Sequence, residues 1–179
     1  MNDTAQEHST PRGTTKRRRG WIIRACVGIT ILALGVLAVT TVRSLLTNQK
    51  AAENLSGIAN AIKVYAGDNH GLYPPSIQAL HACELVSRQG MLNPGSEHSP
   101  PACDFYYVVG LTEEDPSDWI TAFGDMRHHG DRGTVVARND GCVMYLHKEE
   151  FTEELEWFKA AYEEARGEPT TVVPPTAGP

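Results

Sequence analysis

The stretch WIIRACVGITILALGVLAVTTV, residues 21–42, decides the fold. Its only charged residue is Arg24, and the 18 residues from Ala25 to Val42 carry no charge. At a rise of about 1.5 Å per residue, this uncharged part makes a helix of about 27 Å, close to the roughly 30 Å hydrocarbon core of a bilayer. Arg24 and Arg43 flank it, where long basic side chains can reach the two interfaces. The stretch therefore predicts a transmembrane helix at residues 21–42, with the lipid bilayer as its partner.

A cleaved secretory signal is the competing interpretation of this stretch. The apolar run is longer than the 7 to 15 residues of a signal's hydrophobic region, and no small-x-small cleavage site closes it. A membrane span is therefore favoured. The cluster Lys16 to Arg19 lies just before the span, so the positive-inside rule predicts residues 1–20 as a basic leader in the cytoplasm and residues 43–166 as an extracytoplasmic domain.

Charge and length limit what the domain outside the membrane can be. The chain has 179 residues and a formal net charge of −6, and the part from Arg43 onward holds 10 basic and 20 acidic residues. A single modest domain fits this length, which excludes a large multidomain enzyme. An acidic body also repels phosphates, so we expect no nucleic-acid partner.

The helix is expected to continue past the membrane. Leu55, Ile58, Ile62 and Tyr65 follow at spacings of three, four and three residues, the period of a helix with one apolar stripe. No proline stands between Trp21 and the turn-forming residues that begin at Gly67. This pattern predicts one helix over residues 21–66, whose second half packs on the soluble domain.

The remaining residues indicate a small sheet and two further helices. Ser76 is a plausible N-cap for a short helix over 77–86, and 149–166 has the apolar period of an amphipathic helix with an acidic outer face. The segment 167–179 is rich in Pro and Thr and is expected to be disordered. Apolar, aromatic and β-branched runs predict strands at 104–109, 119–123, 134–138 and 142–146.

A tight hairpin is predicted between the last two of these strands. They are separated by Asn139-Asp140-Gly141, residues that tolerate or prefer positive φ. Together with the long helix, this hairpin predicts an α+β fold. In it, the helix emerging from the membrane packs on a small antiparallel sheet, and a C-terminal helix follows.

Two stretches carry a resemblance to a known family. They are AAENLSGIANAIKVYAGDNHGLYPPSIQAL, residues 51–80, and HGDRGTVVARNDGCVMYLHKEEF, residues 129–151. The first is similar to the extramembrane helix and YP turn of bacterial type IV pilin-like proteins, and the second to their C-terminal hairpin. Residues 16–151 as a whole resemble these proteins, especially the major pseudopilin of type II secretion systems. The hairpin residues that match the family's motif at the same spacing are His129, Asp131, Gly133, Asp140, Gly141, Val143 and Leu146.

The resemblance implies a function and a place in the cell. Family members are non-enzymatic subunits anchored in the bacterial inner membrane, with the C-terminal domain in the periplasm and other pilin-like subunits or secretion-system proteins as partners. Their basic leader is cut after a glycine, which makes Gly20 and Trp21 the processing site implied here. The family's fifth mature residue is Glu, whereas this chain has Ala25, preceded by Arg24. A second function therefore stays open: a single-pass tethered domain that binds a protein partner or calcium without polymerising.

Several polar residues are candidates for metal ligands. His128, His129 and Asp131 are close in sequence, but they lack the i, i+4 histidine pair of a helical zinc site. Because family members can hold calcium in a loop of the sheet, and acidic residues abound there, the calcium candidates are Asp115, Asp118, Asp125 and Asp131. A solvated acidic loop is the alternative. No catalytic residue and no other cofactor is predicted.

The four cysteines are expected to play different parts. Cys26 lies in the span, and Cys142 is expected to be a small buried residue of a strand. Cys83 and Cys103 stand at the two ends of a Pro-rich loop, and an extracytoplasmic location permits a disulfide between them. Such a bond would contribute about 3 kcal/mol by constraining the unfolded chain.

Overall fold

The computed structural model describes the backbone of residues 14–92 and 103–175, and their side chains except those of residues 14–23 and 25. The chain divides into two compact units, Met1–Arg43 and Ser44–Pro179. The predicted basic leader therefore lies in part outside the described residues, as does the end of the predicted tail.

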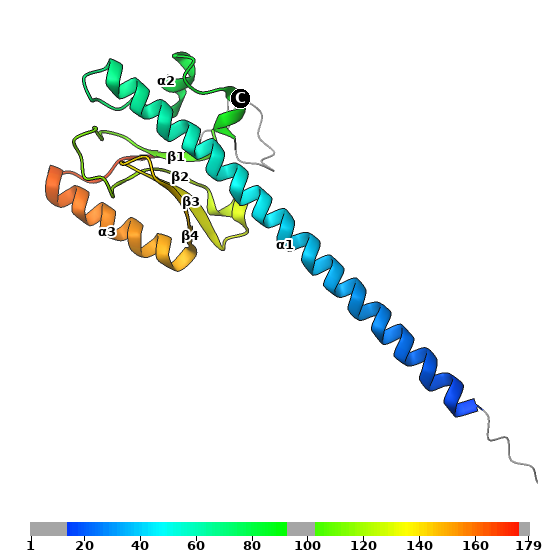
Figure 1. The fold of residues 1–179 in the computed structure, drawn as a ribbon. Helices are drawn as coiled ribbons and strands as arrows, with labels where there is room; N and C mark the ends of the chain where they lie inside the picture. Colours follow the sequence, from blue (N-terminus) through cyan, green and yellow to red (C-terminus); the bar gives the residue numbers. More distant parts are fainter. Residues whose placement is uncertain (1–13, 93–102, 176–179) are drawn as a thin grey trace, which may run out of the picture. The chain divides into compact units, whose positions relative to one another are not determined.

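The long helix α1 runs over Thr14–Asp68, 55 residues (Figure 1). It starts before Trp21 because the Lys and Arg residues ahead of the apolar stretch are good helix formers. Its C-terminal carbonyls are satisfied locally: the Gly71 N–H donates to the Ala66 carbonyl at 2.8 Å, and Asn69 Nδ2 donates to the Tyr65 carbonyl at 2.7 Å. Gly71 has φ +80°, the left-handed conformation that glycine adopts without strain. The prediction of a single long helix is confirmed.

Five antiparallel strands form one sheet in the order β4-β3-β2-β1-β5. Four of them match the predicted strands. The hairpin between β3 and β4 turns at Gly141, where φ is +86°, and Asp140 Oδ1 accepts a hydrogen bond from the Cys142 N–H at 2.7 Å. The strands are β1 (Phe105–Val108), β2 (Ile120–Gly124), β3 (Gly133–Arg138), β4 (Val143–His147) and β5 (Val172–Val173).

The strand β5 corrects the expectation of a disordered tail. Val172 pairs with Val108 and Val173 with Tyr107, and the Val109 N–H donates to the Thr171 carbonyl at 3.1 Å. The open edge of β1 offers unpaired backbone groups, and two β-branched residues suit an extended partner there. The composition of the tail suggested disorder, but the sheet edge determines the structure of its first part.

Shorter helices connect and complete the sheet. Helix α2 (Ile77–Ala82) begins at the predicted N-cap Ser76, whose hydroxyl accepts from the Ala79 N–H at 3.2 Å. It ends earlier than predicted because Glu84 has φ +60°, outside the helical region. The 3₁₀ helices η1 (Arg88–Met91) and η2 (Met126–His129) follow in loops. Helix α3 (Lys148–Arg166) ends at Gly167, at φ +71°.

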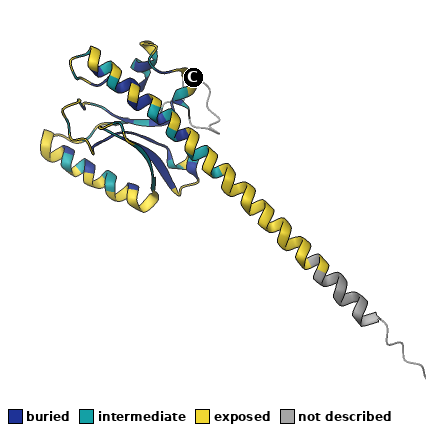
Figure 2. Cartoon of the chain, viewed as in Figure 1, coloured by how far each residue is buried: buried dark blue, intermediate teal, exposed yellow. Residues whose placement is uncertain are grey.

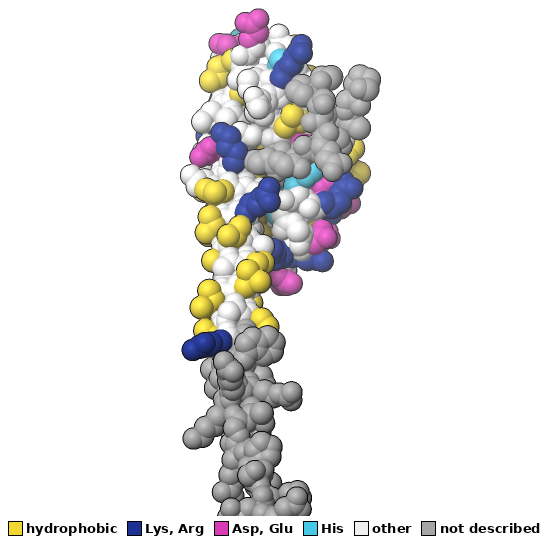
Figure 3. Space-filling view, turned by 90° about the vertical axis from the view of Figure 1, so that its right-hand side faces the viewer, with side chains coloured by type: hydrophobic (Ala, Val, Ile, Leu, Met, Phe, Trp, Pro, Cys, Tyr) yellow, Lys and Arg dark blue, Asp and Glu magenta, His cyan; other side chains and the backbone are white. Residues whose placement is uncertain are grey.

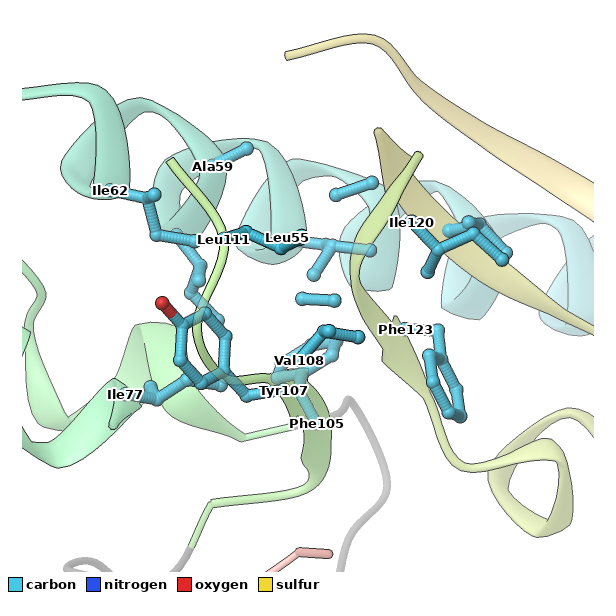
Figure 4. Packing of buried hydrophobic residues seen from close by; sticks show 14 of the residues in the cluster. Leu55, Ala59, Ile62, Ile77, Phe105, Tyr107, Val108, Leu111, Ile120 and Phe123 are labelled. Carbon is cyan, nitrogen blue, oxygen red and sulfur yellow. The ribbon is translucent and has the colours of Figure 1, made fainter. Parts of the chain in front are cut away.

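In the unit from Ser44 onward, the sheet lies between the second half of α1 and α3 (Figure 1). Phe123 of β2 contacts Phe151 of α3, with ring centroids 5.1 Å apart, and Tyr107 of β1 is buried with α1 on the opposite face (Figure 4). The predicted helix stripe is buried at Leu55, Ile58 and Ile62 and half-buried at Tyr65. Figure 2 shows this burial on one side of the helix and over the sheet. The α+β prediction is confirmed.

Candidate functional sites

The first half of α1 presents apolar side chains on all sides. Large residues from Val27 to Leu46 are more than half exposed, and Leu32 is 70% exposed. On the face that Figure 3 shows, apolar side chains follow one another along this part of the helix. The hydroxyls of Thr30, Thr40 and Thr41 donate to carbonyls of the same helix at 2.9 Å, so they need no water. Within the described residues, this is the one helix long and apolar enough to cross a membrane, with a mean hydropathy of 2.0 in its apolar window. The segment is compatible with a single-pass membrane anchor.

The implied processing site lies on the same helix. Gly20 and Trp21 belong to the helical backbone of α1, but their side chains are outside the described residues. Cleavage after Gly20 stays a prediction. Arg24, at the start of the apolar stretch, is exposed.

The two stretches that carry the family resemblance touch each other. The Tyr73 hydroxyl, from the YP turn, donates to Asn139 Oδ1 in the hairpin turn, and Asn139 Nδ2 donates to the Asp115 carbonyl at 2.7 Å. Burial raises the pKa of Tyr73 to about 12, and the charges of Glu113 and Asp115 act in the same direction. The Tyr107 hydroxyl donates to the Pro74 carbonyl at 2.7 Å. The motifs therefore join distant parts of the domain, a contact that sequence analysis missed because it treated Asn139 only as a turn former.

Two of the calcium candidates already have cationic partners. Asp115 accepts hydrogen bonds from the Thr112 N–H at 2.7 Å and from Arg166 Nη2 at 2.6 and 2.7 Å. Asp125 accepts from Arg127 Nε at 2.9 Å, and this hydrogen bond holds the pKa of Asp125 below its usual value. These guanidinium groups take up carboxylate oxygens that a calcium ion would need.

The other two candidates lie at different places. Asp131 shares with Asp125 the lining of a cavity of about 360 Å³ between η2, α3 and β5, whereas Asp118 lines a separate groove beside α3. Across residues 14–92 and 103–175, no three His, Cys, Asp or Glu side chains are gathered in a way that could hold a metal ion. The structure thus does not bring the four carboxylates together.

The two adjacent histidines of η2 face different partners. His129 Nδ1 lies 2.7 Å from Asn48 Oδ1 of α1, and the residue is 6% exposed. Its Nε2 is buried and has no hydrogen-bond partner among the described residues, and desolvation lowers the pKa of the ring below its ordinary 6.5. His128 Nε2 is 3.8 Å from the buried Asp104 carboxylate. His129 therefore holds η2 against α1, a contact that no local sequence signal indicates.

The cysteines are free thiols in the structure. Cys83 is exposed at the end of α2 and Cys103 is buried before β1, where burial raises the pKa of its thiol to about 11. The structure draws no bond between these two residues, and their disulfide stays a prediction. Cys142 is exposed, so the expectation of a buried residue is wrong: it belongs to the hairpin turn and not to β4.

A groove of about 490 Å³ lies beside α3, between this helix and the end of β3. Arg138 of β3 reaches into it and binds Glu154 with two hydrogen bonds, Nε to Oε1 at 2.9 Å and Nη2 to Oε2 at 2.8 Å. The acidic face of this helix was predicted, whereas the hollow that it forms with the sheet was not. The groove is lined by Asp118, Arg138, Glu150, Glu153, Glu154 and Trp157.

Comparison of the chain with known proteins found no matching family model, no matching curated protein and no matching solved structure.

Proposed function

We propose that the chain is a non-enzymatic, membrane-anchored pseudopilin-like subunit of a type II secretion or type IV pilus-like system. The observation that carries this proposal is the two-part helix α1. Its first half presents apolar side chains in every direction, and its second half packs on an antiparallel sheet. The apolar half of such a helix can be surrounded by lipid or by the corresponding helices of neighbouring subunits.

Two further observations support the family assignment. The sequence stretches that resemble type IV pilin-like proteins meet in the fold through Tyr73 and Asn139, which gives both motifs one structural role. The basic cluster before the apolar stretch favours a cytoplasmic N-terminus. In this proposal the protein is a single-pass inner-membrane protein, and its acidic domain lies in the periplasm.

N-terminal mass spectrometry of the membrane-extracted protein tests the proposal. A subunit prepared for assembly is expected to begin at Trp21, with residues 1–20 removed. A Gly20→Leu variant is the control and should keep its leader. An intact leader on the unaltered chain, together with a purely monomeric protein in cross-linking experiments, would contradict the proposed role.

The orientation has its own test. Protease added to spheroplasts should digest residues 43 onward and leave a fragment that contains the basic N-terminus. A protected domain with a cleaved N-terminus would show the opposite orientation.

The second candidate is a tethered domain that binds a protein partner or calcium and does not polymerise. The presence of Ala25 where the family has Glu favours it, because an N-terminal amine buried among helices would have no acidic partner. Calorimetric titration of the full chain with calcium tests the ion-binding form, with Asp115→Asn as the variant and Glu163→Gln as the matched control. Binding that only Asp115→Asn weakens would support calcium at the 112–118 loop.

A further inference from the structure

The acidic groove on α3 contains an exposed indole. Trp157 is 49% exposed, whereas Phe151, Phe158 and Tyr162 of the same helix are buried in the core. Side chains on a helix lean toward its N-terminus, so the Trp157 ring lies toward the turn that carries Glu153 and Glu154. Exposed tryptophan in a hollow is the kind of residue that anchors protein interfaces.

Two carboxylates of the groove remain available to a ligand. Glu154 is paired with Arg138, and Glu150 Oε2 accepts a hydrogen bond from the His147 N–H at 3.0 Å, at the start of α3. The side chains of Asp118 and Glu153, by contrast, have no ion pair or hydrogen bond within the described part of the chain. The hollow thus combines an aromatic face with two unpaired negative charges.

This combination selects the chemistry of the partner. A cation over an indole gains electrostatic attraction, and a planar guanidinium can stack on the ring while it donates two parallel hydrogen bonds to a carboxylate. An ammonium lacks this planar geometry. Calcium gains nothing from an indole, because it prefers oxygen ligands, and anionic partners are repelled by the surrounding acidic helix.

We propose that this groove binds an arginine-bearing segment of a protein partner. The arginine stacks on Trp157 and pairs with Glu153 and Asp118. The proposal does not depend on polymerisation, since it holds equally for an assembled subunit and for a tethered domain.

The probe is acetyl-Arg-Arg-Arg-amide, titrated into the full-length chain in a non-ionic detergent. Affinity is measured by calorimetry. The indole N–H signal of Trp157 is followed by NMR, and it is assigned as the signal that disappears from the spectrum of Trp157→Phe. We expect this signal to shift and those of the other tryptophans to stay in place. Trp157→Ala, and the pair Glu153→Gln with Asp118→Asn, should each weaken binding about tenfold.

Glu163→Gln is the matched control, because Glu163 is an exposed acid of the same helix outside the groove. It should keep the affinity, the melting temperatures of all variants should agree, and acetyl-Lys-Lys-Lys-amide should bind several-fold more weakly. An unmoved Trp157 signal, an equal loss in Glu163→Gln, or equal affinity for the lysine peptide would overturn the proposal.

Discussion

Two leucines of the same helix show how differently α1 behaves along its length. Leu32 is 70% exposed and Leu55 is 0% exposed. Around Leu32 every side of the helix is apolar, whereas Leu55 belongs to a stripe whose other sides carry polar residues such as Glu53 and Asn60. Burial of one such side chain contributes about 1.5–3 kcal/mol, so the first half must find an apolar solvent, while the second half finds the sheet. The distribution of apolar residues around the helix, and not their number, separates a part that is compatible with a membrane anchor from a part that packs in the core.

The largest effect is expected from a charge in the buried stripe. Ile62→Asp places a carboxylate in the contact between α1 and the sheet, which costs several kcal/mol of a total stability of about 5–15 kcal/mol. The domain should unfold or lose most of its thermal transition, as followed by circular dichroism. The control is Asn60→Asp, a similar charge at an exposed position of the same helix. Equal losses in both variants would mean that the stripe does not hold the domain together.

The first half of the helix allows the converse experiment. Leu34→Arg should weaken membrane insertion by about 3 kcal/mol, because the guanidinium would lie near the middle of the span. The domain itself should keep its melting temperature. Alkaline carbonate extraction measures the membrane-bound fraction, with Leu34→Phe as the apolar control. If the arginine variant stayed fully membrane-bound, the first half would not be the anchor.

Sequence reasoning succeeded where the signal is local. The apolar stretch, the helix period, the Ser76 cap and the Asn139-Asp140-Gly141 turn each depend on neighbouring residues, and the long helix, the start of α2 and the hairpin turn form as predicted. Contacts between distant residues were missed. Asn48 and His129 meet across 81 positions, and Tyr73 and Asn139 across 66, so only the assembled fold brings them together.

The candidate sites follow the same rule. The acidic residues were visible in the sequence, but their partners were not: Arg166 binds Asp115 from 51 positions away. The tail was misjudged because two valines among prolines and threonines have no strand signal of their own. Only the edge of β1 makes them a strand.

A pH effect is expected where η2 contacts the second half of α1. Desolvation lowers the pKa of His129 in the folded state below 6.5, so the unfolded chain binds the proton more strongly. The neutral His129 ring therefore makes its full contribution to the free energy of unfolding above pH 6.5. This contribution is lost as the pH falls from 6.5 through the folded-state pKa of the ring. The melting temperature should fall over this window more steeply for the unaltered chain than for His129→Asn. His70→Asn, at an exposed histidine, should keep the steep dependence.

The smallest effect is expected when one glycine from each half of α1 is replaced by alanine. A Cβ added at Gly57 or at Gly35 would meet no neighbouring atom within 4 Å. Gly57→Ala should therefore stabilise the domain by about 0.5–1 kcal/mol through higher helix propensity, which raises the melting temperature by a few degrees. Gly35→Ala should leave that temperature unchanged, because the residue lies outside the domain. A rise with Gly35→Ala would show that both halves unfold as one unit.

The short strand β5 has a consequence for biogenesis. Because β5 follows α3 in the chain, the edge of β1 stays open during synthesis until Val173 has been added and can pair with it. An open edge is a template for pairing with another chain, so incompletely synthesised molecules are prone to aggregation. Once β5 is in place, Pro174 and Pro175 follow it with no backbone N–H to offer, which limits further strand addition. Proteolysis between Arg166 and Val172 would reopen the edge, and so would make the domain prone to association through β1.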